Sequence, residues 1–189
     1  ALVRAELGVR LGDDTEAERL LFQAAGQGGD PYAQAARADW LLDRGRAAEA
    51  LAAVSVGPVE ADALQLRRAI ALHRLGGARA AAVLSGMTAR LDAARRRGEP
   101  HLREEARLAL DVGRDPARAW TLAQENWAGQ REPADAVLLW RSALRAGQTA
   151  QAVRLLQAWT RDPARVDVRL RAAPTDAAAG GVRRPGERT

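Results

Sequence analysis

The residues closest to a metal or acid–base site are His101, Glu104 and Glu105, in the stretch HLREE. On a helix, residues three or four positions apart share one face, so these groups could approach one another. A zinc site needs a third and usually a fourth ligand, however, and the only other histidine is His73. A helix that begins at Pro100 would favour Glu104 and Glu105 in its first turn through its dipole alone. We therefore predict no metal site.

The chain also lacks the motifs of nucleophilic and phosphate chemistry. It has no Gly-rich phosphate loop, no G-x-S-x-G and no cysteine. Ser55, Ser85 and Ser142 have no His and Asp arranged near them in the sequence. We predict no catalytic residue and no cofactor, and hence a protein that is not an enzyme.

The elements that would position any binding residues follow from a repeated spacing. Glycines recur at intervals of 33, 31, 37 and 34 positions, at Gly12, Gly45, Gly76, Gly113 and Gly147. Small residues follow at nearly the same step, at Ala17, Ala50, Ala81, Ala119 and Ala152. A period near 34 residues with two helical segments is typical of a helix-turn-helix solenoid. We expect each Gly to end a first helix in the left-handed conformation, and each Ala to be buried where two helices cross.

Acid–Pro pairs indicate where helices begin, because Pro at the first helical position costs no hydrogen bond. Hydrophobic residues make up 47% of the 189 residues but aromatic residues only 4%, which favours many thin, Ala-rich helices. The prediction is an all-α fold, an α-solenoid of about five antiparallel helix pairs. The expected helices are 1–11, 14–26, 31–44, 47–55, 59–75, 78–97, 100–112, 116–129, 133–146 and 149–160.

The end of the chain has a different composition. The helical period stops after Asp162-Pro163, and the segment from 161 carries seven Arg and four acidic residues, a net +3 of the formal +5. We expect residues 1–162 to form the array and 163–189 a flexible basic tail. The chain has no run of about 18 apolar residues, so we expect no membrane span. Ala1 stands where a helix is already under way, which suggests a trimmed or processed chain whose export signal could have been removed.

These features together resemble tetratricopeptide repeat proteins. The matching motifs include Gly12-Asp13 with Glu16-Ala17 and Gly45-Arg46 with Glu49-Ala50, and they extend over about residues 1–160. The stretches HLREEARLAL and ENWAGQREPADAVLL resemble the C-terminal half of uncharacterised bacterial members, several of which look exported. The resemblance implies a scaffold whose concave groove holds a peptide or a helix, and loosely implies a location outside the cytoplasm. The Lys and Asn residues of the chaperone-binding members are missing, so a chaperone C-terminus is disfavoured.

Counting back from each Gly places a set of polar residues near the concave face. The candidate partner-binding residues are Tyr32, Asp39, His73, Arg103, Arg107, Arg141 and Arg145. This order makes the N-terminal part of the groove acidic and the C-terminal part basic. Arg103, Arg107 and Arg141 could converge on one patch and bind an acidic peptide through paired hydrogen bonds. Ordinary ion pairs with Glu104, Glu105 and Asp111 are an equally acceptable interpretation of the same residues.

A second class of function stays open. All the basic residues are Arg, which in a chain so rich in Ala, Gly and Leu is typical of a GC-rich genome. Arg could nevertheless bind nucleic acid or another anionic surface, with the tail as an electrostatic arm. Arg alternates with Asp and Glu along most of the chain, which disfavours a phosphate-binding stripe. The five Trp residues are expected in the core, with Trp127 partly exposed.

Overall fold

The computed structural model describes residues 1–26, 30–55, 61–76 and 79–171. Within these ranges every regular element is helical, with ten α-helices, two short 3-10 turns and no strand, which confirms the all-α prediction. The helices are α1 (Leu2–Leu11), α2 (Asp14–Ala25), α3 (Pro31–Asp43), α4 (Ala47–Ser55), α5 (Asp62–Leu75), α6 (Ala80–Arg96), α7 (Leu102–Asp111), α8 (Pro116–Gly129), α9 (Pro133–Ala146) and α10 (Thr149–Thr160). The 3-10 turns are η1 (Pro163–Arg165) and η2 (Val168–Leu170).

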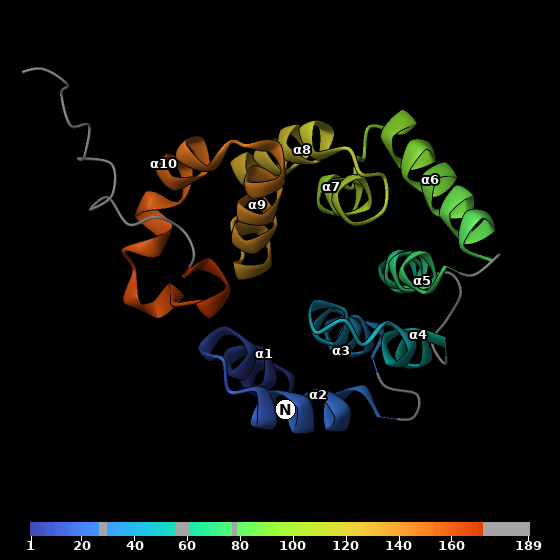
Figure 1. The fold of residues 1–189 in the computed structure, drawn as a ribbon, viewed down its shortest axis with the longest axis horizontal. Helices are drawn as coiled ribbons and strands as arrows, with labels where there is room; N and C mark the ends of the chain where they lie inside the picture. Colours follow the sequence, from blue (N-terminus) through green and yellow to red (C-terminus); the bar gives the residue numbers. More distant parts are fainter. Residues whose placement is uncertain (27–29, 56–60, 77–78, 172–189) are drawn as a thin grey trace, which may run out of the picture.

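The helices follow a curved path that returns almost to its start (Figure 1). Consecutive helices pack on one another except α6 and α7, where α7 packs on α5 instead. The helices α3, α5, α7 and α9 lie on the inner side, while α4, α6, α8 and α10 lie outside. The circuit is closed because η2 contacts both α9 and α1. This arrangement is consistent with an α-solenoid that curves into a ring.

Glycine ends the first helices as the spacing predicts, with one exception. Gly12, Gly45, Gly76 and Gly147 have φ values between 70° and 79°, a region that favours glycine because it has no Cβ. Gly113 does not adopt this conformation; the positive φ falls on Arg114, at 49°. The expectation for Gly113 is therefore wrong. The longer link between α7 and α8 moves the reversal of the chain by one residue.

Acidic residues begin several helices. Asp30 accepts a hydrogen bond from the Tyr32 amide, and Asp115 accepts one from the Arg118 amide. Glu132 and Asp135 form a reciprocal capping box at the start of α9. These side chains satisfy amide groups that have no partner within the helix, which explains why these acid–Pro pairs mark helix starts. The expected start at Glu99-Pro100 is wrong, because α7 begins at Leu102 with His101 as its N-cap.

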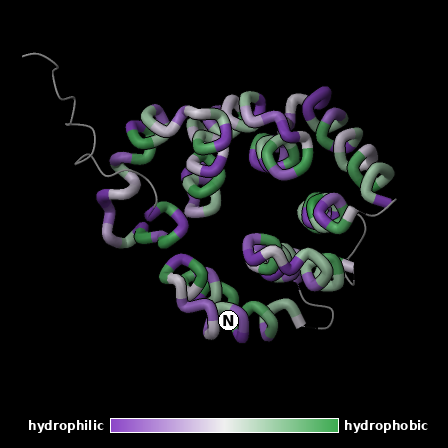
Figure 2. The backbone as a smooth tube through the Cα atoms, viewed as in Figure 1, coloured by the Kyte–Doolittle hydropathy of each residue, from purple (hydrophilic) through white to green (hydrophobic). Residues whose placement is uncertain are grey.

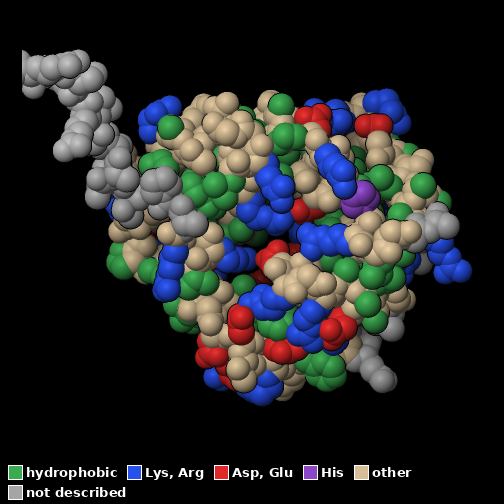
Figure 3. Space-filling view, in the orientation of Figure 1, with side chains coloured by type: hydrophobic (Ala, Val, Ile, Leu, Met, Phe, Trp, Pro, Cys, Tyr) green, Lys and Arg blue, Asp and Glu red, His purple; other side chains and the backbone are tan. Residues whose placement is uncertain are grey.

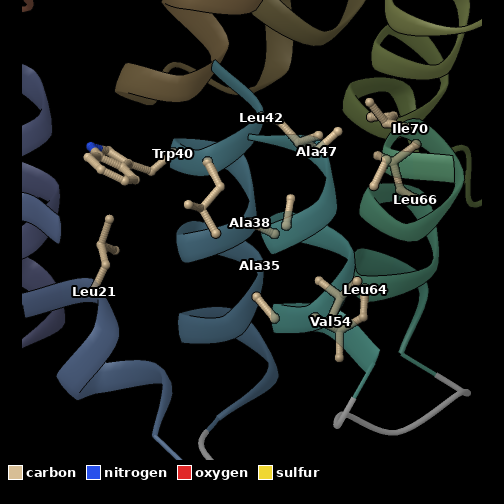
Figure 4. Close-up of a cluster of buried hydrophobic side chains, with 14 of the residues drawn as sticks. Leu21, Ala35, Ala38, Trp40, Leu42, Ala47, Val54, Leu64, Leu66 and Ile70 are labelled. Carbon is tan, nitrogen blue, oxygen red and sulfur yellow. The ribbon is translucent and has the colours of Figure 1, made fainter. Parts of the chain in front are cut away.

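The apolar core consists of two clusters. One runs from Ala5 to Leu91 with Val112, and the other runs from Ala106 to Leu170. Each helix carries hydrophobic and hydrophilic residues along its length, as expected for helices that bury only one face (Figure 2). In the first cluster, Leu21 of α2 points toward Trp40 of α3 (Figure 4).

Four of the five alanines predicted at helix crossings are fully buried: Ala17, Ala50, Ala119 and Ala152. Ala81 is exposed, so its predicted burial is wrong. The buried residues of α6 are Met87, Leu91 and Ala94, which lie farther along that helix. The long α6 therefore packs through its middle and end, and its first turn lies outside the crossing.

The tryptophans fill the space between the Ala-rich helices. All five are buried, with 1–7% of their surface exposed. Trp127 is only 4% exposed, which corrects the expectation that it is partly exposed. Its ring meets Trp159 edge-on at 5.3 Å between centroids, which places it in the core between α8 and α10.

Packed structure continues beyond the expected end of the array at 162. Residues 163–171, which we call the strap, contain η1 and η2 and pack on α10, α9 and α1. Leu170 is 6% exposed and belongs to the second apolar cluster. This part of the expected flexible tail is thus folded. Leu170 anchors it, although the segment lacks the helical spacing of apolar residues on which the prediction depended. The rest of the expected tail, 172–189, lies outside the described residues.

Candidate functional site

Charged side chains from the first helices meet inside the ring. Asp39 of α3 accepts hydrogen bonds from Arg67 of α5 at 2.6 and 3.0 Å, and from Arg107 of α7 at 2.5 Å. Arg67 and Arg107 are mostly buried, with 11% and 12% of their side chains exposed. Burial alone would raise the pKa of Asp39, but the charges and hydrogen bonds of the two guanidinium groups outweigh it and hold that pKa well below its ordinary value.

A second carboxylate repeats this arrangement. Asp111, whose side chain is 4% exposed, lies 2.8 Å from Arg141 of α9, 3.5 Å from Arg107 and 3.9 Å from Arg74 of α5. Burial lowers the pKa of Arg107, but the charges of Asp39 and Asp111 reverse the effect and raise it above its ordinary value. The acidic N-terminal side and the basic C-terminal side of the predicted groove are thus brought face to face, because the array curves into a ring.

Arg103 belongs to a separate cluster. Its guanidinium donates to Asp135 at 2.6 and 2.9 Å and to Glu132 at 2.6 Å, and Asn126 also donates to Asp135 at 2.7 Å. Asp135 is fully buried and also caps α9. The structure therefore brings Arg107 and Arg141 together through Asp111, whereas Arg103 holds the start of α9.

A cavity of about 690 Å³ lies where α1, α3, α5 and α9 meet the strap. The charged residues of its wall are Asp14, Asp43, Arg44, Arg74, Arg141 and Arg169, and the apolar ones are Val9, Leu42, Val137 and Val168. The face viewed in Figure 3 is hollowed near the middle of the ring, and arginines and acidic residues gather there. The volume lies within the range of about 300–1,000 Å³ that is usual for ligand pockets.

The remaining candidate residues lie apart from this cavity. Tyr32, at the start of α3, is 58% exposed and donates a hydrogen bond from its hydroxyl to Glu6 at 3.0 Å. Partial burial and the charge of Glu6 raise the pKa of Tyr32. His73 lies in the last turn of α5, and Arg145 lies exposed in the last turn of α9. Of the seven candidates, only Arg141 lines the cavity, while Asp39 and Arg107 belong to the adjoining ion-pair network.

The candidate list omitted Asp43, Arg74 and Asp111. A sequence signal could have found them, because the residue two positions before each recurring glycine is charged: Arg10, Asp43, Arg74, Asp111 and Arg145. Val168 and Arg169 of the strap had no such signal. Their place in the cavity depends on the closure of the ring, which brings together residues far apart in the chain.

Within the described ranges, no group of three or more His, Asp or Glu side chains is arranged to hold a metal ion. Over the same part of the chain, no helix combines the length and apolar character needed to cross a membrane. Comparisons of the chain with protein-family models, with curated proteins and with solved structures find no match.

Proposed function

We propose that this chain is a non-enzymatic interaction module of the tetratricopeptide type, which binds a segment of a partner polypeptide in the central cavity. The observation that carries the proposal is the composition of the cavity wall. Its wall contains guanidinium and carboxylate groups as well as Val and Leu side chains. The charged groups could hydrogen-bond to the backbone of a bound segment, and the Val and Leu side chains could contact its apolar side chains. The sequence has no Gly-rich phosphate loop, no G-x-S-x-G and no cysteine, so we propose no catalytic activity.

An acidic partner has less support than the arginine cluster alone suggests. Arg103, Arg107 and Arg141 each lie within 2.8 Å of an Asp oxygen. An acidic segment would have to displace these carboxylates, so the arginines alone give no reason to favour it. The same pairing weakens the alternative of nucleic-acid binding through the ring. That alternative predicts binding that falls steeply with salt, whereas cavity binding through apolar contacts does not.

The test is a selection of random peptides on the immobilised full chain, followed by titration of the enriched peptides. Val9 lines the cavity, so Val9→Trp fills part of it with a large side chain. Val3 lies on the same helix but is 79% exposed, so Val3→Trp is a matched control. We expect the enriched peptides to bind wild type and Val3→Trp alike, and Val9→Trp at least tenfold more weakly. Equal binding by all three proteins would show that the cavity is not the site.

A further inference from the structure

Three consecutive side chains of the strap occupy three different parts of the ring. Val168 lies against Gly12, with both its methyl groups 3.4 Å from the position that a Cβ on Gly12 would take. Arg169 lines the central cavity together with Asp43. Leu170 is buried in the second apolar cluster. The strap therefore closes one side of the cavity between α1 and α9, in the place that a bound polypeptide segment would take.

The charge of Arg169 matches its surroundings. Burial lowers the pKa of Arg169, but its hydrogen bonds with Asp167, helped by the charges of Asp167, Asp43 and Asp39, raise it above its ordinary value. Asp43 lies 3.7 Å from Arg141, so this ion pair is beyond hydrogen-bonding distance. The positive charge of Arg169 therefore adds to the attraction that Arg141 exerts on Asp43. A basic group suits this position better than an acidic one.

The attachment of the strap to α1 is slight. Arg10 donates to the carbonyl oxygens of Ala164 and Val166 at 2.8 and 3.3 Å, and both bonds are exposed to solvent. Exposed hydrogen bonds of this kind contribute little net stability, since water competes for the same groups. Two side chains of the strap are buried, Asp167 and Leu170, and Asp167 is paired with Arg169 of the strap itself. Leu170 is therefore its buried apolar anchor to the array, beside the contacts of Val168 with Gly12 and of Arg165 with Trp159.

The strap also holds its own shape. Asp167 accepts hydrogen bonds from the side chain of Arg169 at 2.6 and 2.9 Å and from its amide at 3.0 Å. Asp162 accepts one from the Ala164 amide at 2.9 Å. The ion pairs of Asp39 inside the ring do not involve the strap. Release of the strap would therefore leave its own hydrogen bonds and the ion pairs of Asp39 in place.

We propose that the strap is an internal ligand that closes the cavity between α1 and α9, and that a partner segment with the same order of side chains, apolar, basic and apolar, replaces it there. This inference rests on the proposed function and names the chemistry of its partner. An acidic residue in the middle position would face Asp43 and is disfavoured by that repulsion, which Arg74 and Arg141 in the same wall offset only in part. Because the strap is covalently attached, its effective concentration reaches about millimolar, so a partner binds weakly until the strap is loosened.

The first experiment measures release of the strap without any partner, by hydrogen exchange of 163–171 in the full chain. Leu170→Ala removes the buried anchor and should speed exchange of these amides at least tenfold, while exchange in α9 stays unchanged. Leu155→Ala is the matched control, since Leu155 on α10 is 39% exposed and lies outside the strap. Unchanged exchange in Leu170→Ala, or an equal increase throughout α9, would overturn the idea of a separately releasing strap.

The second experiment adds the strap in trans, as the peptide PARVDVRLR, to the Leu170→Ala protein. We expect binding, and at least tenfold weaker binding of a peptide that carries Arg169→Glu. The control peptide carries Arg171→Glu, which makes the same charge change at an exposed residue at the end of the strap. Equal loss with both substituted peptides would mean that general charge, not the middle position, decides binding, and would overturn the inference.

A cysteine pair provides the third experiment. The Cβ of Val168 lies 3.8 Å from the Cβ position at Gly12, which is the usual separation in a disulfide, and the chain has no other cysteine. In the Gly12→Cys, Val168→Cys, Leu170→Ala protein, oxidation should lock the strap and weaken peptide binding at least tenfold, and reduction should restore it. Equal binding in both states would place the peptide outside the cavity. Selected random peptides that bind while PARVDVRLR does not would overturn this inference alone, whereas failure of both would overturn the proposed function as well.

Discussion

At the scale of single residues, the inner face of the ring is a set of ion pairs between helices that are distant in the chain. Asp39 accepts three hydrogen bonds from arginines and joins α3 to both α5 and α7. Removing one partner of such a group leaves the others unpaired in a partly buried place, which costs more than losing an exposed ion pair. The stability of the ring should therefore depend on Asp39.

We predict that Asp39→Asn lowers the free energy of unfolding by on the order of 2 kcal/mol at pH 7, as measured by urea unfolding. The native pKa of Asp39 is lowered, so the stability it contributes is present above the unfolded pKa of about 4 and is lost as the pH falls toward the native pKa. The difference between wild type and Asp39→Asn should therefore narrow below about pH 4. Glu18→Gln, which removes an exposed pair with Arg46, is the control and should change stability by less than about 1 kcal/mol. A pH-independent difference would mean that ionisation of Asp39 is not what stabilises the ring.

At the scale of helices, most of the fold follows from local signals. Gly at the end of the first helices and acidic residues at helix starts determine where helices end and begin, through contacts within one turn. The ten predicted helices therefore agree with the structure to within three residues at each end. Ala81 and Gly113 departed from the prediction because α6 is long and the link before α8 is extended. Their positions depend on packing between units, which a repeat pattern does not contain.

The buried alanines provide a matched pair of substitutions. Ala50 is fully buried, so Ala50→Leu should overpack its crossing and lower the free energy of unfolding by about 1–3 kcal/mol. Ala81→Leu makes the same change at an exposed site on α6 and should alter stability by about 0.5 kcal/mol or less. Thermal unfolding of the two variants measures the difference. Equal melting temperatures would contradict the packing of α4 described above.

The end of the chain contains two segments that differ in composition. The strap has a buried anchor in Leu170, whereas the sequence beyond Arg171 is small, polar and charged. We predict that a chain ending at Arg171 melts at the same temperature as the full chain, by differential scanning calorimetry. A clear decrease would mean that residues after Arg171 also pack on the array.

At the scale of the whole molecule, the closed circuit was not predictable from the sequence. The repeat spacing indicates that helix pairs stack, but the curvature depends on small rotations between units that accumulate along the array. The expected groove with separate acidic and basic parts is instead a ring in which those parts neutralise each other, through Asp39 with Arg107 and Asp43 with Arg141. The same closure brings the strap to α1 and so creates the cavity.

Closure of the ring can be tested through global stability. The Gly12→Cys, Val168→Cys pair would link the two ends of nearly the whole array, and the loss of unfolded-state entropy is worth up to about 5 kcal/mol for a loop of this length. Gly12 has φ 79°, so the cysteine there is strained, but the strain is the same in the oxidised and reduced protein and cancels in their comparison. We therefore predict a melting temperature several degrees higher for the oxidised form, measured with and without reductant. If the ends of the array were apart in solution, the pair would remain reduced under mild oxidant or would link only by distorting the array, and the oxidised form would melt at or below the temperature of the reduced form.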